Sequence, residues 1–139
     1  MRLLRRATTL LMATSVQAST PAYDVIVYGA SGFTGRLAVE YLTDRYATSG
    51  LKWAIAGRSR ERLDVVLQET KAAVPIIVAD ATDAASVDAM VAQTKVLLNY
   101  AGSPYSTKAL PVVEACARHG THYVDVTGEV ALHLSLIHI

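Results

Sequence analysis

Three glycines within residues 29–35 constrain the fold more than any other feature of this chain. They are spaced G-x-x-G-x-x-G, directly after a short apolar run at residues 24–28 and directly before residues with helical spacing. A nearly continuous apolar run of this length is typical of a parallel strand that is buried on both faces. The segment therefore predicts a strand, a tight glycine-rich turn and a helix, in that order.

Each glycine of this turn has a separate task if the turn holds a dinucleotide. Gly29 lets the strand turn sharply, Gly32 leaves room for a pyrophosphate, and Gly35 lets the helix pack close to the sheet. Free amides and the helix dipole then favour phosphate oxygens. A turn without a ligand is the weaker alternative, because each glycine destabilises a helix start by about 1 kcal/mol. The predicted phosphate site comprises Gly29, Ser31, Gly32, Phe33, Thr34 and Gly35.

The rest of the chain alternates strands and helices. Further strands are predicted at residues 51–56, 74–79, 95–99 and 122–126. Helices are predicted from Phe33 to about Tyr46, after an N-cap at Ser59, and after Asp80 or Asp83; a last helix carries Pro111 in its first turn and ends at Gly120. This alternation predicts an α/β fold with a doubly wound parallel sheet of the Rossmann type, in strand order 3-2-1-4-5.

Apolar spacing supports these helices. Phe33, Leu37, Tyr41 and Leu42 recur at helical spacing in the first helix, and Leu110, Val113 and Ala117 lie on one side of the last helix. Cys116 stands among apolar neighbours, so core packing is expected rather than a nucleophilic role. Residues 100–107 are predicted to form a loop.

The residues after the second strand predict NADP(H) rather than NAD(H). An acidic residue there would bind the adenosine ribose, whereas an arginine accommodates the 2′-phosphate of NADP. Here Arg58 and Ser59 follow the strand and no acid precedes Glu61. Arg58 is predicted to stack on adenine and to contact the phosphate, with a solvated loop charge as its alternative. Asp80, after the third strand, either reaches the adenine or caps the next helix.

Composition excludes several other classes. The formal net charge is +1, so no basic surface indicates nucleic acid. One cysteine cannot form an internal disulfide or a cysteine-ligated metal site, and no metal is expected. No apolar run is long enough to span a bilayer.

The two ends of the chain differ from its centre. Residues 1–22 contain three arginines and no acid, which fits an organelle-targeting leader and equally an unstructured arm; a secretory signal fits less well. Residues 23–129 are predicted to be the nucleotide-binding domain. Residues 130–139 do not continue the pattern. We expect a non-native or truncated tail, because its last six residues resemble the translation of a transposase end sequence used in sequencing libraries.

Four separated blocks resemble the saccharopine dehydrogenase-like oxidoreductases, including the trans-acting enoyl reductases. They are YDVIVYGASGFTGRL at residues 23–37, WAIAGRS at 53–59, LLNYAG at 97–102 continuing into PY and PVVEAC, and YVDVTGE at 123–129. Ser103 and the Lys108-Ala109 pair depart from the family pattern, in the loop expected beside the nicotinamide.

The resemblance implies an NADP-binding domain that is followed, in the family, by a substrate and dimerisation domain. Relatives act on carbonyl, imine or enoyl groups, or belong to lipid metabolism. The segment expected beside the nicotinamide comprises Asn99, Tyr100, Ala101 and Gly102. The resemblance also implies a small-molecule or lipid-related substrate, a homodimer through the absent domain, and a mitochondrial or cytoplasmic location with association to lipid droplets or membrane surfaces.

No catalytic residue is assigned from the sequence. A short-chain dehydrogenase needs a tyrosine and a lysine four positions apart, whereas Tyr105 and Lys108 are three apart and are expected to be a solvated pair. Asp125 and Glu129 are expected near the cleft, where either orienting a substrate or capping the sheet end is possible. The chain is accordingly expected to be the cofactor-binding half of an oxidoreductase, incomplete and inactive alone. A non-catalytic NADP(H)-binding or sensor module is the alternative.

Overall fold

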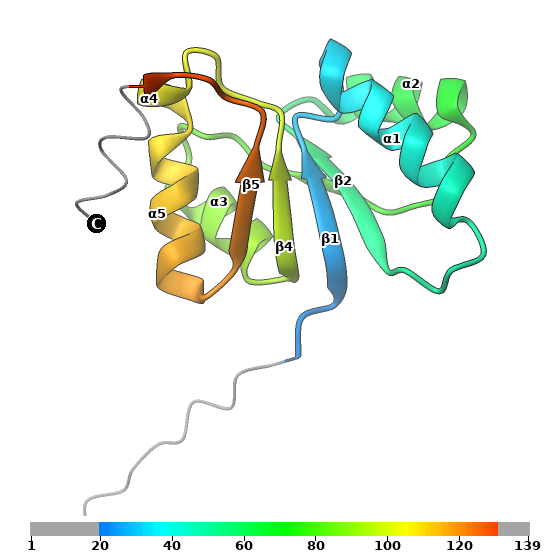
Figure 1. The fold of residues 1–139 in the computed structure, drawn as a ribbon, viewed down its shortest axis with the longest axis horizontal. Helices are drawn as coiled ribbons and strands as arrows, with labels where there is room; N and C mark the ends of the chain where they lie inside the picture. The colour runs from blue at the N-terminus through cyan, green and yellow to red at the C-terminus, as the bar shows by residue number, and fades with distance from the viewer. Residues whose placement is uncertain (1–19, 131–139) are drawn as a thin grey trace, which may run out of the picture.

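The computed structural model describes residues 20–130, which form a five-stranded parallel sheet with helices on both faces (Figure 1). The strand order is β3-β2-β1-β4-β5, so the predicted Rossmann topology is confirmed. The strands are β1 (Tyr23–Tyr28), β2 (Trp53–Gly57), β3 (Ile76–Val78), β4 (Thr94–Asn99) and β5 (His122–Asp125). The helices are α1 (Phe33–Tyr46), α2 (Arg60–Thr70), α3 (Ala84–Val91), α4 (Tyr105–Lys108) and α5 (Leu110–His119). The predictions on residues 1–19 and 131–139 lie outside the described residues.

Two apolar layers hold the helices to the sheet. On one face α3 and α5 pack against Ile26 and Leu97, and on the other α1 and α2 pack against Val27 and Ile55. All four of these strand residues are fully buried. Because β1 and β4 lie at the centre of the sheet and are covered on both faces, their carboxyl ends form a rigid edge for a site.

Capping residues mark the helix ends much as predicted. The Ser59 hydroxyl accepts a hydrogen bond from the Arg62 amide at 3.3 Å, and Gly120 ends α5 with a φ of 68°. For α3 the cap is Asp83, whose carboxylate accepts from the Ala85 amide at 3.1 Å. Asp80 precedes that cap, so the alternative in which Asp80 itself caps the helix is wrong.

The apolar residues whose spacing predicted α1 are mostly exposed. Leu42 is buried, but Phe33 is 84% exposed, and Leu37 and Tyr41 are also exposed. The residues of α1 that reach the core are Gly35, Val39 and Leu42. Phe33, Leu37 and Tyr41 recur every four residues and therefore form a stripe, but this stripe is exposed.

Leu37 and Tyr41 of that stripe line an apolar groove of about 590 Å³ on the α1 face of the sheet. Val126 stands at the same groove and is 55% exposed, and Val124 of β5 is 52% exposed. The groove is lined by Val25, Thr34, Leu37, Ala38, Tyr41, Leu42, Tyr46, Leu51, Leu98, Tyr100 and Val126.

Helix α5 buries only part of the side that carries Leu110, Val113 and Ala117. Val113 is buried but Ala117 is exposed, and the buried set is Val112, Val113, Ala115 and Cys116. A four-residue helix, α4, occupies part of the predicted loop and sets where α5 begins. The core position predicted for Cys116 is confirmed, and burial raises the pKa of its thiol to about 12.

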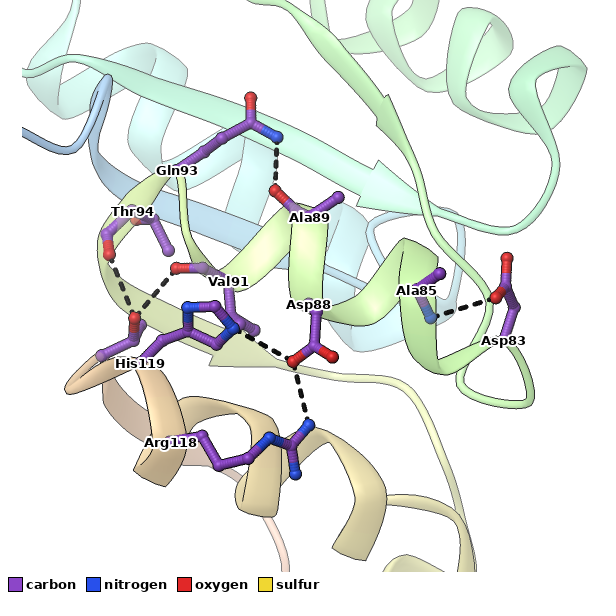
Figure 2. A network of polar contacts seen from close by, with 10 residues as sticks. Asp83, Ala85, Asp88, Ala89, Val91, Gln93, Thr94, Arg118 and His119 are labelled. Atoms are coloured by element: carbon purple, nitrogen blue, oxygen red, sulfur yellow. Dashed lines mark hydrogen bonds and ion pairs between the residues drawn. The ribbon is translucent and has the colours of Figure 1, made fainter. Parts of the chain in front are cut away.

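Charged side chains join α3 to the end of α5 (Figure 2). Asp88 accepts a hydrogen bond from the Arg118 guanidinium at 2.9 Å and lies 3.1 Å from His119 Nε2. The Thr121 hydroxyl donates to the Val91 carbonyl at 2.9 Å. Hydrogen bonding to Arg118 is the main cause that lowers the pKa of the Asp88 carboxyl, and His119 adds to it.

We expect Asp88→Asn to lower the thermal unfolding temperature at neutral pH and to have a smaller effect in acid. Since the folded-state pKa is lowered, the carboxylate stabilises the fold above its ordinary pKa of 3.8, and this contribution is lost as the pH falls through the folded-state pKa. Calorimetry between pH 3 and pH 7 measures the effect, with Glu114→Gln on the exposed side of α5 as the control. A difference from the unmutated chain that does not shrink between pH 7 and pH 3 would contradict this account.

Candidate dinucleotide-binding site

The glycine-rich turn connects β1 to α1 at the carboxyl edge of the sheet. The Gly29 amide donates to the Ala56 carbonyl at 2.9 Å, and the Gly32 amide donates to the Gly29 carbonyl at 3.0 Å. Gly32 is the N-cap of α1, no side chain caps this helix, and no acidic residue stands in its first turn. The first amides of α1 therefore have neither a side-chain acceptor nor a repelling charge, which suits a phosphate group.

Two of the three glycines are required by the protein's own packing. A Cβ on Gly35 would lie 2.2 Å from the Gly29 carbonyl oxygen. A Cβ on Gly29, where φ is +81°, would lie 2.5 Å from the Ala101 amide nitrogen. These distances are far shorter than any real contact, so the turn closes only with glycine at both positions.

Gly32 is different, because nothing in the described chain requires a glycine there. Its φ of −79° and ψ of 167° suit any residue, and an added Cβ would meet only the Gly29 carbonyl oxygen, at 3.4 Å. Gly32 is exposed, so the space that its missing side chain leaves opens to the outside. A ligand that must approach the backbone closely would account for this glycine, and the turn therefore fits a dinucleotide pyrophosphate.

The other predicted residues of the turn surround this opening. Ser31 is half-buried, and Phe33 and Thr34 are exposed at the start of α1. Thr34 also lines the apolar groove. Contacts of these three side chains with a cofactor stay predictions.

The residues predicted for the adenosine end lie where β2 and β3 end. Arg58 is exposed directly after Gly57. The Asp80 carboxylate accepts hydrogen bonds from the Thr82 amide at 2.9 Å and from the Thr82 hydroxyl at 2.8 Å. These bonds lower the pKa of Asp80, and the Arg58 charge lowers it further. Arg58 and Asp80 thus act on one another electrostatically across the edge of the sheet.

The sequence did not predict that Glu61 contacts Ser59 at the adenosine end of the site. The Ser59 hydroxyl donates a hydrogen bond to Glu61 Oε2 at 2.9 Å, and hydrogen bonding to the Glu61 amide and to Ser59 lowers the pKa of Glu61. Arg60 points elsewhere, because it pairs loosely with Asp64 at 4.0 Å and is largely exposed. Because the negative Glu61 carboxylate beside Ser59 does not attract a phosphate, Arg58 must supply most of the attraction for a 2′-phosphate.

The residues predicted for the nicotinamide end follow β4. Asn99 is fully buried, and its side-chain oxygen accepts from the Ala101 amide at 2.9 Å. The Tyr100 amide donates to the Tyr28 carbonyl at 2.8 Å, which holds this segment beside the end of β1. Gly102 has a φ of +103°, a backbone conformation that favours glycine. The structure thus places residues 99–102 directly against Gly29.

Three further predictions concern the loop after this segment. Tyr105 is buried, so its expected exposure as a solvated pair with Lys108 is wrong; burial raises the pKa of its hydroxyl. Lys108 is exposed and donates to the Ser103 carbonyl at 3.1 Å. Asp125 and Glu129 are both engaged in hydrogen bonds within the chain, which favours the capping role over a free carboxylate.

The fold and this edge together define a dinucleotide-binding Rossmann domain. The glycine turn lies in the middle, with Arg58 and Asp80 on the side of β2 and β3 and Asn99 on the side of β4. Within residues 20–130 no group of three or more His, Cys, Asp or Glu residues is placed to hold a metal ion. No helix in the same part of the chain is long and apolar enough to cross a membrane.

The chain belongs to the saccharopine dehydrogenase family, and it carries that family's NADP-binding domain. The model of the saccharopine dehydrogenase NADP-binding domain matches residues 25–135. This confirms the resemblance seen in the four sequence blocks and the prediction of NADP as cofactor.

Curated relatives are 40 to 44% identical to this chain. A trans-acting enoyl reductase of Mycobacterium tuberculosis is 42% identical over 111 residues, covering 78% of this chain and 26% of its own. A lipid droplet localized protein of Caenorhabditis elegans is 44% identical, covering 78% and 27%. A saccharopine dehydrogenase-like oxidoreductase of Bos taurus is 40% identical, covering 77% and 28%. The chain therefore spans about a quarter of the length of these relatives.

Solved structures share the fold. Apo saccharopine dehydrogenase from Saccharomyces cerevisiae aligns with a TM-score of 0.64 at 20% identity, over 81% of this chain and 23% of that one. A short-chain dehydrogenase/reductase from Veillonella parvula in complex with NADP aligns with a TM-score of 0.57 at 16% identity, over 76% and 48%.

Proposed function

We propose that this chain is the NADP(H)-binding half of an oxidoreductase and is inactive without further substrate-binding residues. The observation that carries the proposal is Gly32, an exposed glycine that the chain's own packing does not require, at the N-terminus of an uncapped helix. When bound, the cofactor supplies or accepts a hydride at its nicotinamide ring. The substrates implied by the family are carbonyl, imine or enoyl compounds.

The chain's own residues bind and orient the cofactor in this proposal. The turn from Gly29 to Gly35 and the amides of α1 hold the pyrophosphate, with Ser31, Phe33 and Thr34 beside it. Arg58 and Ser59 hold the 2′-phosphate, and Asp80 stands at the adenine. Residues 99–102 form the wall beside the nicotinamide. A titration of NADPH against the chain tests the proposal, and micromolar or tighter binding supports it.

A non-catalytic NADP(H)-binding or sensor module is the second candidate. It is favoured by the engagement of Asp125 and Glu129 in internal hydrogen bonds, which leaves neither as a free acid or base. Adding the remaining domain of a relative in cis discriminates between the two. Hydride transfer to an enoyl or imine substrate supports the oxidoreductase, whereas binding without turnover supports the module.

A lipid-related substrate and an association with lipid droplets or membrane surfaces are part of the proposal for the whole protein. Two relatives carry names that refer to an enoyl reductase and to lipid droplets, and the groove beside α1 is lined by apolar residues. The proposal for the whole protein also includes a mitochondrial or cytoplasmic location and a homodimer formed through a further domain. Imaging of a fluorescent fusion in lipid-loaded cells tests the location.

We expect NADPH to bind at least tenfold more tightly than NADH, and Arg58→Ala to remove most of that difference, about 1.4 kcal/mol per tenfold. Arg58 directly follows β2, where the 2′-phosphate is expected, so its loss weakens NADPH binding more than NADH binding. Arg60→Ala is the matched control, since it removes the same charge two residues away. Equal binding of both cofactors by the unmutated chain would contradict the assignment of Arg58.

A further inference from the structure

A continuous series of hydrogen bonds runs beneath the segment expected at the nicotinamide. The Asn99 side-chain amide nitrogen donates to the Tyr123 hydroxyl oxygen at 2.9 Å, and the Tyr123 hydroxyl donates to Asp125 Oδ2 at 2.8 Å. Asp125 Oδ1 accepts from the Thr127 amide at 3.1 Å. The Thr127 hydroxyl oxygen accepts from the Glu129 amide at 3.0 Å.

The series closes on the far end of the same loop. Glu129 Oε1 accepts from the Tyr105 amide at 2.8 Å, and Oε2 accepts from the Ser106 amide at 2.9 Å. Asn99 of β4 accepts from the Ala101 amide and is bonded to Tyr123 of β5, so one end of the loop is held through β5 itself. The other end is held by Glu129, which follows β5.

Chemistry allows only one direction for these bonds. The Ala101 amide can only donate, so Asn99 presents its oxygen to Ala101 and its NH2 group to Tyr123. An ionised carboxylate can only accept, so the Tyr123 proton points at Asp125. Burial is the main cause that raises the pKa of Tyr123, and the Asp125 carboxylate adds to it, so the hydroxyl keeps its proton. Tyr123 is therefore a fixed link rather than an acid that exchanges its proton.

The series of hydrogen bonds ends beside the glycine turn. The Ala101 amide that Asn99 holds is the atom that a Cβ on Gly29 would meet at 2.5 Å. A displacement of residues 101–102 would therefore open the wall between the turn and the end of β4, on the nicotinamide side of the site. The adenosine side, at Arg58 and Asp80, lies on the other side of β1, at the ends of β2 and β3, and shares none of these bonds.

We propose that Tyr123 and Glu129 are positioning residues that set the wall beside the nicotinamide through Asn99 and the Tyr105–Ser106 amides. This inference rests on the proposed function, because it deepens the assignment of residues 99–102 to that wall. Neither side chain contacts the cofactor; each acts by holding the loop. Tyr123→Phe removes one oxygen atom from the series, and Glu129→Gln leaves one oxygen for two amides.

The test compares two ligands on the 139-residue chain. NADPH contains the nicotinamide, whereas adenosine 2′,5′-bisphosphate contains only the adenosine half. We expect Tyr123→Phe and Glu129→Gln each to weaken NADPH binding about tenfold and to leave bisphosphate binding within about twofold. The fluorescence emission of NADPH bound to either variant is expected to shift toward that of free NADPH, which loss of stability alone would not produce.

Tyr23→Phe is the matched control, because it removes a tyrosine hydroxyl at the start of β1, at the opposite end of the strands from the site. An equal loss of both ligands in Tyr123→Phe, or unchanged NADPH binding and emission, would overturn the inference. Failure of the unmutated chain to bind either ligand would instead overturn the proposed function. Retained bisphosphate binding also shows that each variant is folded.

Discussion

Replacing Gly32 by alanine is expected to weaken NADPH binding about a hundredfold, equivalent to about 2.8 kcal/mol, with almost no loss of stability. The added methyl group would stand where the pyrophosphate approaches the α1 amides. Inside the protein it would meet only the Gly29 carbonyl oxygen, at 3.4 Å, in a backbone conformation open to any residue. Isothermal titration with NADPH measures the affinity, and urea unfolding measures the stability.

Gly128→Ala is the control for this experiment. Gly128 is also exposed, and an added Cβ there would meet nothing within 4 Å. Both variants should change the free energy of unfolding by less than about 1 kcal/mol, but only Gly32→Ala should lose affinity. Full NADPH affinity in Gly32→Ala would show that the pyrophosphate lies elsewhere.

Gly35→Ala is expected to lower the free energy of unfolding by about 3 kcal/mol or more. Alanine is the better helix former by about 1 kcal/mol, so propensity alone predicts a gain. The clash outweighs this gain and makes the variant less stable, since the Cβ would lie 2.2 Å from the Gly29 carbonyl oxygen and 2.8 Å from the Ala30 Cα. Both neighbours are backbone atoms, so relief requires α1 to move away from the sheet.

Gly57→Ala is the matched control, because Gly57 is also buried but its Cβ would meet only the Leu63 side chain, at 3.5 Å. Urea unfolding of the two variants should separate them clearly. If Gly35→Ala unfolds at the same urea concentration as the unmutated chain, the close packing of α1 on the turn would be refuted.

The topology could be predicted because its signals are local. The apolar run of β1, the glycines after it and the caps at Ser59 and Gly120 each mark an element boundary within a few residues. Given the alternation of strands and helices, right-handed crossovers make 3-2-1-4-5 the leading strand order.

The buried faces of two helices were harder to predict, because periodicity shows a stripe but not what the stripe faces. Phe33, Leu37 and Tyr41 form such a stripe on α1, yet the sheet is reached by Gly35 and Val39. On α5 the face depends on where the helix begins, which α4 determines. Both outcomes depend on tertiary packing that a single helix does not encode.

The positions of the candidate site residues followed from the topology, but the bonds between them did not. Asn99 and Arg58 were placed correctly at the carboxyl edge because Asn99 ends β4 and Arg58 directly follows β2. The link from Asn99 to Tyr123 joins residues 24 positions apart, and only neighbouring strands β4 and β5 bring them together. The sequence offered one hint, the alternation of Tyr123, Asp125, Thr127 and Glu129.

The contact between Gly29 and Ala101 should couple amino-acid substitutions in one half of this domain to substitutions in the other half. The turn belongs to the first strand–helix unit and the loop to the fourth strand, yet their backbones touch without room for a methyl group. A chimera that joins one relative's first half to another's second half should therefore fold only when its glycine turn and its loop after β4 fit each other. Homologues that carry a side chain at the Gly29 position must also carry a displaced loop after β4, and the two features should be gained or lost in the same lineages.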